Sequence, residues 1–120
     1  MLLLSDESEF QAILDNKAYH KYTINNDHYN RMVHNYIGNI GNYSKSDKPL
    51  AFFLYIAGGF GSNIDKQLKN IDDATDVNGS AISVSNVIKM VEQHREKPYT
   101  HHRIKDIFSV NRQVLMKDII

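Results

Sequence analysis

The 120-residue sequence contains no cysteine, which excludes a disulfide framework and any zinc site built from cysteine ligands. It carries no net charge, because 14 lysine and arginine residues balance 14 aspartate and glutamate residues. That balance argues against a protein held on nucleic acid by bulk charge alone. The lack of cysteine is in keeping with a reducing compartment, and we expect a cytoplasmic protein.

Long apolar segments are also missing. The N-terminal run Met1-Leu2-Leu3-Leu4 meets an acidic residue at Asp6, so it is too short for a signal sequence or a membrane span. What is present suits one small domain over residues 1–120, because a hydrophobic fraction of 42% can bury a core. Because the N-terminal run is too short to span a membrane, we expect no membrane association.

Two segments have the pattern of strands. Residues 9–15 alternate, with Phe10, Ala12 and Leu14 on one face and Ile13, Asp15 and Lys17 on the other. Residues 50–57 form an unbroken apolar run, which is typical of a central strand covered on both faces.

Helical spacing alternates with these strands. We predict helices over residues 27–40, 62–72, 85–96 and 100–109, capped by Asp27, by a Ser62–Asp65 capping box, by Ser85 and by Thr100. A turn at residues 77–79 should lead into a short strand at 80–84. Alternating strands and helices predict an α/β fold.

The motif Asp15-Asn16-Lys17 carries the most specific chemistry. Residues i and i+2 of a strand project from one face, so the two charged side chains would stand together at a strand end. The carboxylate suits a hard cation such as Mg²⁺, and the ammonium can position water or offset phosphate charge. That pairing serves phosphodiester hydrolysis. A surface ion pair without function is the alternative interpretation.

The surroundings of this motif resemble those of FokI-type cleavage domains, members of the PD-(D/E)xK nuclease superfamily. The resemblance starts at Ile13-Leu14-Asp15-Asn16-Lys17-Ala18-Tyr19 and continues from about Phe10 to about Phe108. It includes a helix that ends in Tyr36-Ile37, the strand and turn from Phe53 to Phe60, Asn63 and Gln67-Leu68 on a helix, and the segment 78–84 before another helix.

The resemblance implies a truncated restriction-endonuclease-like core, in which helices flank a central mixed sheet of about three to four strands. It implies the C-terminal portion of the cleavage domain of a type II restriction enzyme, with type IIS as the expected class. Asp15 would then bind Mg²⁺, and Asp15 and Lys17 would be catalytic. The partners would be double-stranded DNA, a second copy for double-strand cleavage, and a separate N-terminal recognition domain of the parent protein.

One departure from the family concerns a second acidic metal ligand. The family places an aspartate, often after proline, on the strand before the Asp-x-Lys strand. Here only Asp6, Glu7 and Glu9 precede the motif, with shorter spacing and no Pro-Asp. Either the chain is a fragment, or it is a decayed remnant, or one of these acids substitutes. We also expect the first helix and the first strands of the family core to be missing. The alternative function is therefore a catalytically inactive module for dimerisation or DNA contact.

Weaker candidates lie near the motif. Gly59 and Gly61 stand between a strand and a helix, where backbone N–H groups can receive a phosphate, and Asn63 and His20 could reach the same phosphate. The simpler interpretation is a tight turn that needs glycine at positive φ and an asparagine that caps the helix.

Two more residues concern dimerisation. Asp27 and Arg31 have the i, i+4 spacing of a helical surface ion pair. In FokI-type domains an Asp and an Arg at this separation form the dimer contact, which makes these two residues candidates for that role. Basic residues in the C-terminal third are balanced in part by acidic ones, so we interpret them as a solvated face.

Overall fold

A computed structural model describes residues 2–5 and 10–120 of the chain. Its centre is a five-stranded sheet in the order β1-β2-β3-β4-β5. The first strand is antiparallel to the second, and the remaining pairs are parallel. The strands are β1 (Leu2–Ser5), β2 (Gln11–Asn16), β3 (Leu50–Ala57), β4 (Asn78–Ser83) and β5 (Arg112–Gln113).

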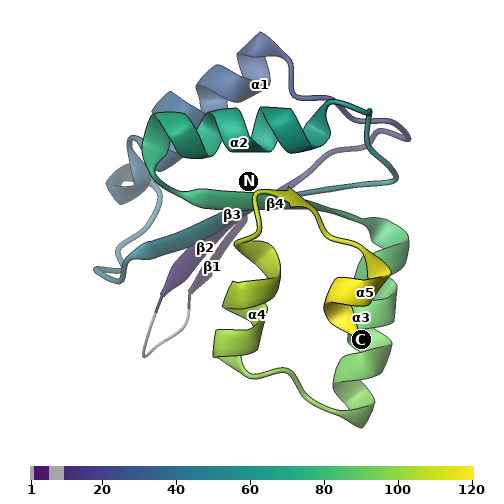
Figure 1. The fold of residues 1–120 in the computed structure, drawn as a ribbon. Coiled ribbons are helices and arrows are strands. Elements are labelled where there is room, and N and C mark those ends of the chain that lie inside the picture. The colour runs from purple at the N-terminus through teal and green to yellow at the C-terminus, as the bar shows by residue number, and fades with distance from the viewer. Residues whose placement is uncertain (1, 6–9) are drawn as a thin grey trace.

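Helices cover both faces of this sheet (Figure 1). One face carries α1 (Asn26–Asn30), the π-helical segment η1 (Arg31–Ile37) and α2 (Ile64–Thr75), with the short 3₁₀ turn η2 (Ile40–Asn42) after η1. The opposite face carries α3 (Val84–Glu96), α4 (His101–Phe108) and α5 (Met116–Ile119). No helix in the described part of the chain is long and apolar enough to cross a membrane.

The α/β fold with a mixed sheet flanked by helices is confirmed, although the sheet has more strands than expected. The additional strands are β1, which pairs with β2 from Leu2↔Leu14 to Ser5↔Gln11, and the two-residue β5 beside β4. Both strands are too short to show an alternating pattern in the sequence. They form at the edges of the sheet, where unpaired backbone groups accept and donate their hydrogen bonds.

Side-chain alternation divides the core into two clusters. The predicted faces of β2 are confirmed, because Phe10 and Ala12 join one cluster and Ile13 joins the other. The cluster beneath η1 and α2 contains Ile13, Tyr22, Ile24, Met32, Val33, Phe53, Tyr55, Ala57, Ile64, Leu68, Ile71 and Ala81. The cluster beneath α3, α4 and α5 contains Phe10, Ala12, Phe52, Leu54, Ile82, Ile107, Phe108, Val114 and Ile119.

The helix predicted over residues 27–40 is interrupted. It begins one residue earlier, at Asn26, because the Asn25 side chain rather than that of Asp27 accepts the capping hydrogen bond, from the His28 N–H. From Arg31 to Ile37 the winding is that of a π-helix, a form that often occurs at functional sites.

Three other local predictions needed correction. No capping box forms at Ser62: α2 begins after Asn63, whose side chain makes no capping hydrogen bond. The cap of α3 is Ser83 rather than Ser85, whereas the Thr100 cap of α4 is confirmed. Asn78 lies inside β4, because the chain turns earlier, at the left-handed Asp76.

Candidate active site

Asp15 and Lys17 lie at the C-terminal end of β2 and face α1 and η1. The Lys17 N–H donates to the Ile56 carbonyl, so the chain continues alongside β3 for one residue beyond the strand. The Lys17 ammonium lies 3.2 Å from Oδ2 of Asp15, and only 11% and 9% of the two side chains are exposed. This ion pair is therefore shielded from water, unlike the solvated surface pair of the alternative interpretation.

Aromatic and imidazole side chains surround this ion pair. Tyr55 is the neighbour of Asp15 on β3 and is fully buried. Tyr22 packs against it with ring centroids 5.5 Å apart, and the Tyr22 hydroxyl forms a 2.8 Å hydrogen bond with Nδ1 of His28. None of these three residues was predicted from the sequence as part of the site. Only Tyr55 had a usable signal, since it becomes the neighbour of Asp15 once the strands at 9–15 and 50–57 are paired.

The electrostatics of the cluster keep its hydroxyl groups protonated. Burial raises the pKa of Tyr22, and the nearby Asp15 carboxylate raises it further. Burial also raises the pKa of Tyr55, with smaller contributions from Tyr22 and Asp15. Burial, then the Lys17 and Arg31 charges, lower the pKa of His28. At neutral pH a neutral His28 can therefore accept the hydrogen bond that Tyr22 donates.

The segment after Lys17 is fixed by the turn that follows β3. The Tyr22 N–H donates to the Gly59 carbonyl, and the Gly61 N–H donates back to the Tyr22 carbonyl. Further along, the Gln67 side chain of α2 pairs with both backbone groups of Ile24. These bonds keep Tyr22 pressed over Tyr55, so the glycine turn supports the site.

The glycines of this turn serve close backbone approach, which corrects the expectation of a positive φ. No glycine in the described part of the chain has a positive φ. A Cβ at Gly59 would lie 2.5 Å from the His20 carbonyl oxygen, and one at Gly61 would lie 2.4 Å from the Thr23 methyl. Only a residue without a side chain allows the two segments to pass each other here.

The candidate phosphate contacts lie in the same region but differ in availability. His20 and Asn63 are exposed, and Gly59 is half-buried. Gly61 is buried, and its N–H is already bonded to the Tyr22 carbonyl. The first three therefore remain accessible to a ligand, whereas the Gly61 amide has a partner in the protein.

The remaining candidates are exposed on the helical segment after the site or fall outside the described residues. Asp27 on α1 and Arg31 at the start of η1 are both exposed. Asp6, Glu7 and Glu9 fall outside the described residues, so their role as substitute ligands stays a prediction.

Asp15 is the buried carboxylate that this region offers to a cation. Among the described residues no group of three or more histidines and carboxylates could hold an ion. Mg²⁺ is usually held by one or two carboxylates together with substrate phosphate and water. One carboxylate in a shielded, polar-lined position fits the lower limit of that requirement, so Asp15 could hold the cation only with a phosphate oxygen or a further acid.

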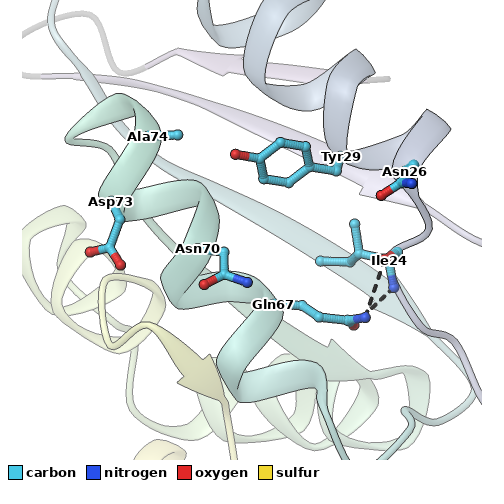
Figure 2. Close-up of a pocket in the computed structure, with 7 residues that line it drawn as sticks. All are labelled: Ile24, Asn26, Tyr29, Gln67, Asn70, Asp73 and Ala74. Atoms are coloured by element: carbon cyan, nitrogen blue, oxygen red, sulfur yellow. Dashed lines mark hydrogen bonds between the residues drawn. The ribbon is translucent and has the colours of Figure 1, made fainter.

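A cavity lies elsewhere, between α1 and α2. It has a volume of about 580 Å³ and is lined by Ile24, Asn26, Tyr29, Gln67, Asn70, Asp73 and Ala74 (Figure 2). Figure 2 shows the Gln67 amide joined by hydrogen bonds to the Ile24 backbone. Asp15 and Lys17 do not line it, so this cavity is separate from the ion pair.

Comparison with known proteins shows the family of the chain. The family model described as "FokI, cleavage domain" matches residues 1–115. The chain belongs to the FokI cleavage-domain family. The resemblance seen in the sequence is thereby confirmed.

Solved structures similar to this FokI-family chain agree in fold. The structure of the restriction endonuclease FokI has a TM-score of 0.74 and 19% identity, and the structure of FokI bound to DNA has a TM-score of 0.76 and 20% identity. In both cases 92% of this chain is covered but only 22% of FokI, so the chain spans about a fifth of that enzyme's length. No curated protein sequence matches the chain.

Proposed function

We propose that this chain is the C-terminal portion of the DNA-cleavage domain of a type II restriction endonuclease, of the type IIS class. The observation that carries the proposal is the shielded Asp15–Lys17 pair at the end of β2 in a FokI-family fold. A buried ion pair stabilises a fold less than apolar residues of the same size, so its presence favours a chemical role. The enzyme would act in the cytoplasm.

Asp15 would hold Mg²⁺ through its carboxylate, together with an oxygen of the scissile phosphate. Such an ion supplies Lewis-acid stabilisation of phosphate charge and lowers the pKa of water. Lys17 has a second role, since its ammonium is held 3.2 Å from Asp15. From there it can orient the attacking water or stabilise the charge that develops on the phosphate.

The geometry of β1 suggests where a second acid would act. Because Leu2 pairs with Leu14 and Leu3 with Ile13, the N-terminal end of β1 runs beside the end of β2 that carries Asp15. Ser5 pairs with Gln11 at the opposite end. An acidic residue on a continuation of β1 ahead of Leu2 would therefore stand closer to Asp15 than Ser5 does, and Ser5 is the described residue that precedes Asp6.

Double-stranded DNA is the proposed substrate, in line with the related FokI structure that is bound to DNA. His20, Gly59 and Asn63 flank the site and are the candidates for backbone contact, with Gly61 only supporting the turn. The chain has no net charge to grip DNA, so a separate N-terminal recognition domain would provide sequence-specific binding.

Double-strand cleavage by one active site per domain requires two domains. Asp27 and Arg31 are exposed on neighbouring turns of the helical segment that follows the site, which makes them available to a second copy. We infer that this segment forms the homodimer contact, and that charge reversal at either position would weaken it.

An inactive module for dimerisation or DNA contact is the second candidate. It is favoured by the single carboxylate at the site, since no cluster of three metal-ligating residues occurs in the part of the chain that the structure describes. Under this alternative the Asp15–Lys17 pair would be a remnant of an ancestral active site and would now have only a structural role.

An N-terminal extension that continues β1 separates the two candidates. An aspartate three residues before Leu2 would lie on the face of Ile13 and Asp15, whereas one two residues before Leu2 would lie on the opposite face. We expect the 120-residue chain to nick supercoiled plasmid poorly with Mg²⁺, the first extension to nick it efficiently, and the second to behave like the original chain.

Two outcomes would change this view. Strong Mg²⁺-dependent cutting by the original chain would assign the second carboxylate to Asp6, Glu7 or Glu9, which individual substitution would identify. Failure of every form to cut, with DNA binding retained, would favour the inactive module.

A further inference from the structure

The hydroxyl of Tyr55 has no hydrogen-bond partner among the described groups, although the residue is fully buried. Its ring is held by Tyr22 at 5.5 Å and by Phe53 at 6.1 Å between centroids. A buried polar group without a partner costs about 1–3 kcal/mol. Phenylalanine would fill the same space without this cost, so the packing alone does not account for a hydroxyl here.

The hydroxyl lies on the side of the sheet where Asp15 lies. Asp15 and Tyr55 are register partners on parallel strands, so both side chains project from the same face. The tyrosine side chain is the longer of the two and reaches farther from the sheet. The charged and titratable groups that act on its hydroxyl come from β2, from the segment after it and from η1, namely Asp15, Tyr22, Tyr36 and Arg31.

The other polar groups of the cluster already have partners. The Tyr22 hydroxyl is bonded to His28, and Lys17 is paired with Oδ2 of Asp15. Tyr55 is therefore the buried hydroxyl of this cluster that still has a hydrogen bond to donate. A tyrosine hydroxyl carries its proton at neutral pH, so this group is available as a donor.

We propose that Tyr55 is a positioning residue of the Asp15 metal site, with its hydroxyl donating a hydrogen bond to a water that is shared with Asp15 or with the bound cation. This inference rests on the proposed function. A divalent ion such as Mg²⁺ keeps several of its waters when it binds protein, and outer-shell groups that hold such ligands typically change metal affinity by about 10- to 100-fold. Tyr55 acts through water, so it controls cation affinity rather than DNA affinity.

The test is Mn²⁺ binding to the complete 120-residue chain in the presence of a short DNA duplex, which supplies the phosphate oxygen that Asp15 needs. The electron paramagnetic resonance signal of the free ion reports binding, with the duplex alone as the blank. Tyr55→Phe should raise the Kd for Mn²⁺ by roughly tenfold. It should leave the melting temperature unchanged or higher, because the variant no longer buries an unpaired hydroxyl. Tyr43→Phe is the matched control, since Tyr43 is 45% exposed, and it should change neither quantity.

The outcomes distinguish this inference from the proposed function. If Asp15→Asn abolishes Mn²⁺ binding but Tyr55→Phe binds as tightly as the original chain, the role of Tyr55 is wrong and the metal site stands. A lower melting temperature with unchanged affinity would make the hydroxyl a structural group and would also overturn the inference. Equal binding by the original chain and Asp15→Asn would overturn the metal site itself, and the role of Tyr55 with it.

Discussion

The two faces of the sheet are built from different kinds of side chain. Beneath α1, η1 and α2, the core contains the Asp15–Lys17 pair and the hydroxyls of Tyr22 and Tyr55. Beneath α3, α4 and α5, the core is an apolar cluster whose largest members are Phe10, Phe52 and Phe108. The same strands supply both faces, because successive residues alternate between them.

We expect the residues that carry the chemistry to lie on one face of the sheet and the residues that contribute most to stability to lie on the other. Burying charges and hydroxyls is unfavourable unless each finds a partner, so the polar face contributes less to folding than an apolar face of equal area. The apolar face compensates for this smaller contribution to folding, because it removes apolar surface from water. We therefore expect substitutions on the apolar face to lower the free energy of unfolding, and those at the charged pair to lower activity.

The largest change in stability should come from Phe52→Ala. Phe52 is fully buried and packs against Phe10 and Phe108 with ring centroids 5.9 and 5.4 Å away. Its truncation should lower the free energy of unfolding by about 3–5 kcal/mol, measured by urea denaturation. Val91→Ala is the control, because Val91 on α3 is 48% exposed. Equal effects of the two substitutions would mean that the apolar face is not the main source of stability.

An intermediate change is expected from Gly59→Ala in the turn that supports the polar face. The new Cβ would lie 2.5 Å from the His20 carbonyl oxygen, so the segment after Lys17 would have to move. We expect a loss of about 1–3 kcal/mol, together with a changed near-ultraviolet circular dichroism signal from the tyrosines. Gly41→Ala meets nothing within 4 Å and should be nearly neutral. If Gly59→Ala is just as neutral, the two segments do not pack as closely as described.

Sequence reasoning succeeded where one local pattern decides the structure. The alternation of residues 10–15 placed Asp15 and Lys17 on one face, and the apolar run at 50–57 gave β3 its bounds. The caps were less predictable, because several polar residues precede each helix and tertiary packing selects among them. Asn25 and Ser83 took the roles expected of Asp27 and Ser85.

The rest of the site depends on contacts between distant residues, which a local pattern cannot show. The partners Tyr22 and Tyr55 are 33 positions apart and meet only after β2 and β3 pair. Gly79 gives another example: it was expected in a turn, but it lies in β4, where a Cβ would lie 2.0 Å from the Phe53 ring. Its lack of a side chain makes room for a ring that is distant in sequence.

The smallest change in stability should come from acidification, which protonates Asp118 on α5, a helix that covers the apolar face. The Arg112 guanidinium, with help from the Leu115 N–H, lowers the pKa of Asp118 to about 2, although burial opposes the shift. The ionised carboxylate is favoured by folding, so its contribution is present above the ordinary carboxyl pKa and is lost as the pH falls toward 2. We expect a loss on the order of 1 kcal/mol across that interval, since the pair is partly solvated.

Thermal melting at several pH values checks this expectation. Asp118→Asn should be less stable than the original chain at neutral pH and should lose less stability on acidification. Asp47→Asn, at an exposed loop position, should keep the acid sensitivity of the original chain. An unchanged acid response in Asp118→Asn would show that the sensitivity arises elsewhere.

The central claim, that Asp15 and Lys17 carry the chemistry, is tested most directly by the cleavage rate of Lys17→Ala. The measurement uses plasmid DNA and Mg²⁺, in the extended chain with the aspartate on the face of Asp15. The rate should fall by roughly two to three powers of ten while DNA binding stays nearly unchanged, because the ammonium acts on charge that develops in the transition state. Lys17→Arg should not restore the rate, and Lys45→Ala in the exposed loop should cut normally. Cleavage by Lys17→Ala at the rate of Lys45→Ala would contradict the claim and reduce the shielded pair to a structural ion pair.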